Sequence, residues 1–323
     1  MGEGDATTVK PEGRVAPPWA AKRRRVPFVT VKDLLWVIYL YPLRWLVAGS
    51  PRVTRGLAHV ATPMFRLLST RRAAEVRARL TNELGVGLTD AESDVLARRY
   101  IGNAVRRVLD DLDLANDGEE PTCRAFRGRE FLDEALAGRR GVLLVSFHWY
   151  AERAAKRYLA KAGYPVLSVR SQDPHDPRAS RLGKRLLQPR YIRFLHEVLR
   201  DEVFAEDPEC SLKILRRLRS GGITDIHIDA QYTRDLARVP FLGRDRSFPT
   251  GPLRLARVAG CPVLPMAATG HLRSLEIRID PPLPLDYTLS SEELCRESMP
   301  VLLRAIEGHV REYPDQWELW TRL

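Results

Sequence analysis

A short apolar segment that ends on a histidine constrains the fold of this chain more than any other feature. Residues 141–147 are apolar and rich in leucine and valine, and they follow the charged pair Arg139 and Arg140. A run of this length is typical of a strand buried on both faces of a sheet. His148 ends the run, and Glu152 begins a helix-forming segment four positions later. Open α/β sheets place reactive groups at such strand-to-helix junctions, so the sequence predicts a site here.

Strand and helix patterns alternate through the rest of the C-terminal two thirds of the chain. Apolar or alternating runs predict strands at 141–147, 164–170, 222–228, 262–268 and 272–280, and helical patterns predict helices at 131–137, 151–162, 208–219, 251–258 and from 290 onward. Residues 239–251 are rich in Gly, Pro and charged residues and are predicted to form a loop. This alternation predicts an α/β fold in which a sheet lies between layers of helices.

The region before this core is predicted to be helical and is rich in arginine. Thr89 and Glu92 have the spacing of a capping box, which indicates a helix start. The polar turn at 116–121 is the clearest internal boundary. We therefore expect a helical N-terminal region at 51–115 and an α/β core at 116–323, with 51–323 forming one structural domain.

The N-terminus combines a basic tail with an aromatic, apolar helix. Residues 1–26 are polar and rich in Gly and Pro, end in the basic run 22–25, and are expected to be disordered. The apolar run that follows is interrupted by Pro42 and Arg44, and a membrane span needs about 20 apolar residues. Its Trp and Tyr residues favour an interfacial membrane helix at 27–50. The alternative is a helix that packs into the core.

Composition favours an anionic partner. The chain has 52 Lys and Arg against 41 Asp and Glu, a formal net charge of +11. An acidic membrane surface, a phosphorylated substrate, an acidic carrier protein or nucleic acid would fit this charge. Aromatic residues are not interleaved with the basic ones, so nucleic acid is supported by charge alone and is not expected as a partner. The 4 cysteines are widely spaced and predict free thiols, and neither a metal site nor a bound cofactor is predicted.

Several segments occur in a distinctive order along the chain. They are the aromatic N-terminal helix, the strand 141–147 with His148, the block that starts at Val169 and Arg170, the strand end with Asp229 and Gln231, the loop 239–244, the segments 250–256 and 260–265, and the Pro-x-Gln-Trp ending at 314–317. Together they resemble the bacterial lipid A lauroyl/myristoyl acyltransferase family, which is part of the lysophospholipid acyltransferase superfamily. The resemblance implies a central mixed sheet flanked by helices, as in glycerolipid acyltransferases, with an N-terminal helical region.

The resemblance also implies an activity. A peripheral or monotopic protein at the cytoplasmic face of the cell membrane would move a fatty acyl group from acyl-CoA or an acyl carrier protein to a hydroxyl of a lipid or glycolipid. His148 would be the general base and Glu152 would orient its ring, and anionic membrane lipid would be a binding partner. The residues expected to bind substrate are Arg170, Arg181, Asp229, Gln231 and Arg244.

One position departs from the family pattern. The family places Asp or Glu five positions after the histidine, where this chain has Arg153, and the nearest carboxylate is Glu152. If the turn is one residue tighter, Glu152 reaches the imidazole. Otherwise Glu152 is a solvated helix residue paired with Lys156, and the chain is a non-catalytic lipid-binding relative. His227, inside a predicted strand, is interpreted as a core residue.

Overall fold

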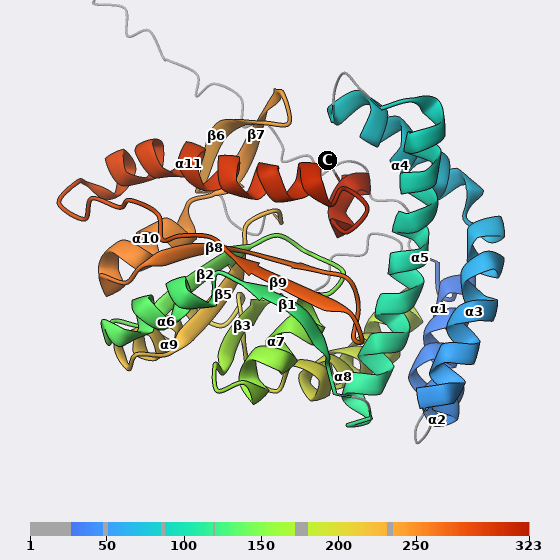
Figure 1. The fold of residues 1–323 in the computed structure, drawn as a ribbon. Coiled ribbons are helices and arrows are strands. Elements are labelled where there is room, and N and C mark those ends of the chain that lie inside the picture. Colours follow the sequence, from blue (N-terminus) through green and yellow to red (C-terminus); the bar gives the residue numbers. More distant parts are fainter. Residues whose placement is uncertain are drawn as a thin grey trace, which may run out of the picture.

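The computed structural model describes residues 27–47, 51–84, 88–118, 120–171, 180–230 and 235–322. Two of our expectations concern residues outside these ranges, namely the basic run at 22–25 and Gln231. The predicted α/β fold is confirmed: a mostly parallel sheet lies among helices, and a group of N-terminal helices stands at one side (Figure 1).

The main sheet has 7 strands in the order β1-β9-β8-β2-β5-β3-β4. Its strands are β1 (Cys123–Arg127), β2 (Val142–Ser146), β3 (Val166–Arg170), β4 (Glu202–Phe204), β5 (Ile223–His227), β8 (Val263–Thr269) and β9 (Leu275–Ile279). The strands β8, β2, β5, β3 and β4 are mutually parallel, whereas β9 runs antiparallel to β8 and carries β1 parallel to itself. The sheet is therefore mixed, as expected, and β2 lies near its centre.

Helices cover both faces of this sheet. They are α6 (Arg129–Ala137), α7 (Glu152–Lys161), η3 (Gly183–Leu187), α8 (Gln188–Leu199), α9 (Cys210–Arg219), α10 (Gly251–Ala259) and α11 (Ser291–Glu312). The crossovers through α7 and α8 run toward β4, and those through α9 and α10 run in the opposite direction. Because such crossovers are right-handed, the two pairs of helices cover opposite faces. The connections that leave the carboxyl ends of the neighbouring strands β2 and β5 run in opposite directions, and α/β sheets form their sites at such a point.

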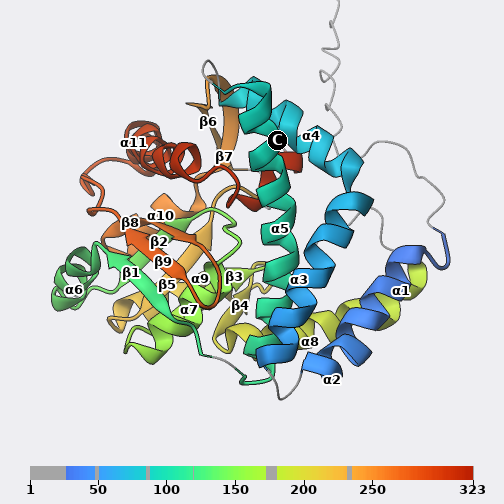
Figure 2. The same ribbon diagram turned by 45° about the vertical axis from the view of Figure 1, so that its right-hand side comes forward.

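The N-terminal helices form a separate group beside the sheet. They are α1 (Val31–Ile38), η2 (Tyr39–Leu43), α2 (Arg44–Val47), α3 (Pro51–Leu68), α4 (Thr70–Glu83) and α5 (Asp90–Ala115). Figure 2 shows α5 between the sheet and α3, with α1 beyond. Thr89 and Glu92 form the predicted capping box at the start of α5. Among the described residues, none of the helices has the length and apolar character that a membrane crossing requires.

The structure differs from expectation at several short elements. The predicted loop at 239–251 is instead a hairpin of β6 (Leu236–Phe241) and β7 (Arg244–Pro249). Its two turn residues, Leu242 and Gly243, have positive φ values of 53° and 74°, as two-residue hairpin turns require. Strands β1 and β4 are short and irregular in their hydrophobic pattern, and we did not predict them.

The C-terminal segment closes the fold between the N-terminal helices and the sheet. It ends in the 3₁₀-helix η4 (Glu318–Arg322) beside α4 and α5 (Figure 1). The Tyr100 hydroxyl donates to the carbonyl of Glu318 at 2.6 Å, and Arg107 forms an ion pair with the Glu318 carboxylate. The N–H of Glu318 in turn donates to the carbonyl of His148 at 2.8 Å. The chain end therefore holds the loop that follows β2.

Candidate active site

His148 directly follows β2 and lies at the carboxyl end of the central parallel strands. All residues of β2 are buried, as the apolar run predicts. Gly141 precedes the strand with φ +67°, and a Cβ there would lie 2.3 Å from the carbonyl oxygen of Leu218. Only glycine accepts both this conformation and this close approach. His148 follows the strand with 22% of its side chain exposed, so its ring is open to a substrate.

His148 is paired with Asp229. In the parallel pair of β2 and β5, Ser146 lies opposite His227, so residues two positions further along each strand also meet. The Nδ1 atom of His148 lies 2.6 Å from Oδ1 of Asp229. The backbone N–H of His148 donates to Oδ2 of the same carboxylate at 2.8 Å. Asp229 therefore holds both the backbone and the imidazole ring of His148 in place.

The environment of Asp229 keeps it charged. Its side chain is 1% exposed, and burial alone would raise its pKa. The contacts with His148 outweigh burial and hold the pKa of Asp229 below its ordinary value. A carboxylate at Nδ1 selects the tautomer in which Nδ1 carries the hydrogen, and Nε2 is then free to accept a proton.

Trp317 supports the same carboxylate. Its indole N–H donates to Oδ2 of Asp229 at 2.8 Å. The Trp317 ring packs against Phe147 and Phe241, with ring centroids 5.3 and 6.0 Å apart. Sequence reasoning singled out this residue only as part of the Pro-x-Gln-Trp ending and gave it no role. A buried indole needs a hydrogen-bond acceptor, but the sequence does not show which acceptor it meets.

Glu152 lies beside His227 rather than in the expected place beside His148. Its Oε2 atom is 2.9 Å from Nε2 of His227, and its side chain is 6% exposed. Glu152 is therefore not a solvated helix residue, and Lys156 pairs with Asp225 at 2.8 Å. The reason is geometric, because α7 begins at Glu152 and its first turn faces β5. His227 is buried at the end of β5 and is also a member of a charged cluster, not only a core residue.

Arg153 occupies the position at which the resembling family carries its carboxylate. The Arg153 side chain is 12% exposed and forms an ion pair with Asp111 of α5. It also lies 3.8 Å from Oε1 of Glu152. Arg153 thus joins α7 to the N-terminal helices, and Asp229 is the carboxylate in contact with His148.

The other residues predicted to bind substrate are dispersed. Arg170 is engaged by Glu202, at 2.9 Å from Nη2 to Oε1, and donates to the carbonyl of Ile192 at 3.0 Å. Arg181 lies exposed before η3, and its backbone N–H donates to the carbonyl of Pro27. Arg244 begins β7 with 59% of its side chain exposed, 3.6 Å from Glu83. Of the predicted residues, Asp229 contacts His148 directly, whereas the guanidinium of Arg170 is hydrogen-bonded within the protein.

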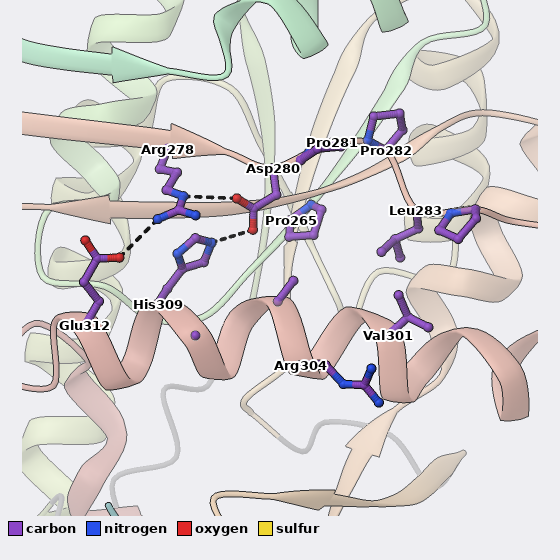
Figure 3. Close-up of a pocket in the computed structure, with 13 residues that line it drawn as sticks. Pro265, Arg278, Asp280, Pro281, Pro282, Leu283, Val301, Arg304, His309 and Glu312 are labelled. Atoms are coloured by element: carbon purple, nitrogen blue, oxygen red, sulfur yellow. Dashed lines mark hydrogen bonds and ion pairs between the residues drawn. The ribbon is translucent and has the colours of Figure 1, made fainter.

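A groove lies on another part of the molecule, between β9 and α11 (Figure 3). Its volume is about 470 Å³, and its lining includes neither His148 nor Asp229. Figure 3 shows that Arg278 and His309 both contact the carboxylate of Asp280, and Nε2 of His309 lies 2.7 Å from Oδ2 of Asp280. In this second His–Asp pair, His309 of α11 is buried, with 2% of its side chain exposed, and the Asp280 side chain is 15% exposed. Among the described residues, no group of three or more His, Cys, Asp or Glu side chains has a metal-binding arrangement.

The structure is an α/β fold in which a histidine at the end of a central strand contacts a buried aspartate. Residues 34–323 match the family model described as bacterial lipid A biosynthesis acyltransferase, and the chain belongs to this family. The suspected family resemblance is thereby confirmed, and the protein is an acyltransferase of lipid biosynthesis by family. A search of curated proteins finds no match.

Proposed function

We propose that this protein transfers a fatty acyl group from an acyl thioester to a hydroxyl of a lipid or glycolipid, with His148 as the general base. The observation that carries the proposal is the 2.6 Å contact between Nδ1 of His148 and the buried Asp229. An alcohol attacks a thioester slowly unless a base takes its proton during the attack. The membership of the chain in a lipid acyltransferase family supports this reaction type.

The proposed chemistry uses His148 twice. Nε2 of His148 accepts the proton of the acceptor hydroxyl while the hydroxyl oxygen forms a bond to the thioester carbonyl carbon. The tetrahedral intermediate then collapses, the carbon–sulfur bond breaks, and the leaving thiolate takes the proton from Nε2. Asp229 stabilises the imidazolium that exists between these steps, in place of the Glu152 that we first expected in this role. No covalent acyl-enzyme is needed.

The donor and the acceptor are proposed only as classes. Acyl-CoA and acyl carrier protein are both acidic, and the net charge of +11 suits either. The exposed Arg181 and Arg244 are candidates to hold a phosphate of donor or acceptor. Arg170 is a weaker candidate because Glu202 and a backbone carbonyl already satisfy its guanidinium.

The test is product formation by the full-length protein. Radiolabelled palmitoyl-CoA and palmitoyl carrier protein are each incubated with the protein and a bacterial membrane lipid extract in detergent. We expect label to move from one of the thioesters into a lipid that mild alkali cleaves, as an ester is cleaved. Lipid binding without label transfer from either donor, across several acyl chain lengths, would instead identify a non-catalytic relative.

We further propose that the N-terminal helices rest on the cytoplasmic face of the membrane as a peripheral or monotopic anchor. Most of the large apolar side chains that the described residues leave exposed lie on α1 to α3 and on the segment before α1. They include Phe28, Leu34, Leu35, Trp45, Val60, Leu67 and Leu68, with Trp45 being 85% exposed. Patches of this kind on a soluble surface mark interaction sites, and tryptophan favours the membrane interface.

Replacing Leu34, Leu35 and Trp45 together by serine should weaken binding to vesicles of phosphatidylglycerol and phosphatidylcholine by at least about tenfold. Sedimentation of protein with vesicles measures the bound fraction. The control replaces Leu212 and Val258, which are 52% and 54% exposed on the α/β core, and should leave binding unchanged. Equal loss of binding in both variants would contradict the proposed anchor.

Trp317→Phe should reduce the rate of acyl transfer by about tenfold while the protein stays folded. The change keeps an aromatic ring in the core but removes the hydrogen bond to Asp229, and a bond to a charged group contributes about 1.5–3 kcal/mol. Trp320→Phe is the matched control, because its indole N–H donates to the carbonyl of Pro314 instead. A wild-type rate in Trp317→Phe would show that Asp229 does not need this support.

A further inference from the structure

A second histidine lies against His148, and the mechanism above does not use it. The ring centroids of His148 and His227 are 4.4 Å apart, and their planes meet at 69°. His227 ends β5, two residues before Asp229, so the two histidines and Asp229 come from neighbouring strand ends. His148 therefore has Asp229 at Nδ1 and a second imidazole beside its ring.

His227 is the centre of a buried charged cluster, which we define as His227, Glu152, Asp225 and Lys156. Its Nε2 atom lies 2.9 Å from Oε2 of Glu152, 3.0 Å from Oδ2 of Asp225 and 3.4 Å from Nζ of Lys156. Asp225 also accepts a hydrogen bond from the Ser146 hydroxyl at 2.8 Å. No side chain of the cluster is more than 9% exposed.

The charges of this cluster balance only if His227 carries a proton at both ring nitrogens. Glu152 and Asp225 contribute two negative charges, and Lys156 contributes one positive charge. A neutral His227 would leave one uncompensated negative charge in the interior, which is costly. Burial lowers the pKa of His227, but the carboxylates of Glu152 and Asp225 outweigh burial and the charge of Lys156, and raise it to about 10. The next cation, Arg153, lies 3.8 Å from Oε1 of Glu152 and forms its closer ion pair with Asp111.

We propose that His227 is held as an imidazolium by Glu152 and Asp225 and is a positioning residue that keeps the neighbouring His148 in its neutral, proton-accepting form. This inference rests on the proposed function, in which His148 is the base. A fixed positive charge beside a ring makes a second protonation of that ring less favourable. An anionic membrane surface and an anionic donor favour protonation of a nearby ring, because they attract protons. The His227 imidazolium compensates for them, and Glu152 acts on His148 through His227.

The first test is the pH profile of acyl transfer by the full-length His227→Gln variant. Loss of the positive charge makes His148 easier to protonate, so the acid limb of the kcat profile should move to higher pH by about 0.5–1 unit. Asp229, Glu152, Asp225 and Lys156 also face the two rings, so comparison with a variant that keeps a positive charge at position 227 is needed to assign the shift to that charge. His227→Lys restores a positive charge and should return the limb toward its wild-type position. A merely structural role would lower the rate at every pH without moving the limb.

The matched control is His309→Gln, which removes another buried histidine from a carboxylate partner (Figure 3). It should leave the acid limb in place. An unshifted limb in His227→Gln, together with loss of activity in His148→Gln, would overturn this inference and leave the proposed function standing. Full activity in His148→Gln would instead remove the proposed function.

A second test needs no acyl-transfer activity and is made on the wild-type protein. Long-range ¹⁵N–¹H correlation spectra of the histidine-labelled wild-type protein distinguish an imidazolium from a neutral ring. The signals of His227, assigned by their loss in His227→Gln or by through-bond connection in the wild-type protein, should be those of an imidazolium near pH 7.5. Signals of a neutral His227 at that pH would overturn the inference even if the variant did not fold.

Discussion

His148→Gln should lower the rate of acyl transfer by about 10²–10⁴-fold, because it removes the proposed base. Glutamine keeps polar atoms at the strand end, but it cannot accept a proton at neutral pH. The side chain is partly exposed and belongs to no core cluster, so the variant should fold. Steady-state rates with radiolabelled palmitoyl-CoA or palmitoyl carrier protein measure the loss, and circular dichroism checks the fold.

The control for this prediction is His309→Gln, which changes a histidine of α11 that also contacts an aspartate but lines the separate groove between β9 and α11. It should retain acyl transfer close to the wild-type rate. Vesicle binding by His148→Gln should also be unchanged, because the exposed apolar side chains of α1 to α3 are intact. Activity within a few fold of wild type in His148→Gln would refute His148 as the base.

Asp229→Asn should cost about 10²–10⁴-fold in kcat, with a much smaller change in KM. The amide has nearly the shape of the carboxylate, but it cannot stabilise the imidazolium of His148. It also presents N–H groups where Nδ1 needs an acceptor, so the wrong tautomer of His148 becomes favoured. Rates measured at saturating donor and acceptor separate this effect from substrate binding.

Two comparisons sharpen the Asp229 prediction. Asp280→Asn alters the other His–Asp pair and should leave kcat near its wild-type value. Glu152→Gln should cost less than Asp229→Asn, because Glu152 contacts His227 and leaves the pair of His148 and Asp229 intact. A larger loss for Glu152→Gln than for Asp229→Asn would return the orienting role to Glu152.

Much of the fold could be predicted from the sequence because its longer elements have strong local signals. The apolar run before His148 forms β2, the capping box of Thr89 and Glu92 begins α5, and the helical pattern from 290 onward forms α11. The elements that escaped prediction are short or depend on partners. Strand β4 has three residues and exists because it pairs with β3, and the hairpin of β6 and β7 turns at Leu242, a residue that rarely takes positive φ.

Only part of the candidate site could be predicted from the sequence. The position of His148 at a strand end follows from its own neighbours in sequence. Arg170 also ends a strand as expected, yet the structure engages it with Glu202, a residue on the adjacent strand β4. A tryptophan such as Trp317 is expected to pack in the core, but the hydrogen-bond acceptor of its indole N–H, Asp229, lies 88 positions away in the chain. Contacts of this kind depend on how distant segments pack, and local patterns do not specify them.

The sequence by itself determined that a buried strand ends on His148 and that the surrounding segments are those of a lipid acyltransferase family. Only the tertiary structure decided which carboxylate serves that histidine. Glu152 is near in sequence, but the start of α7 turns it toward His227. Asp229 is 81 positions away, and the register of two parallel strands brings it to Nδ1 of His148. Strand register is set by the packing of the whole sheet, so a pairing that depends on it cannot be predicted from spacing along the chain.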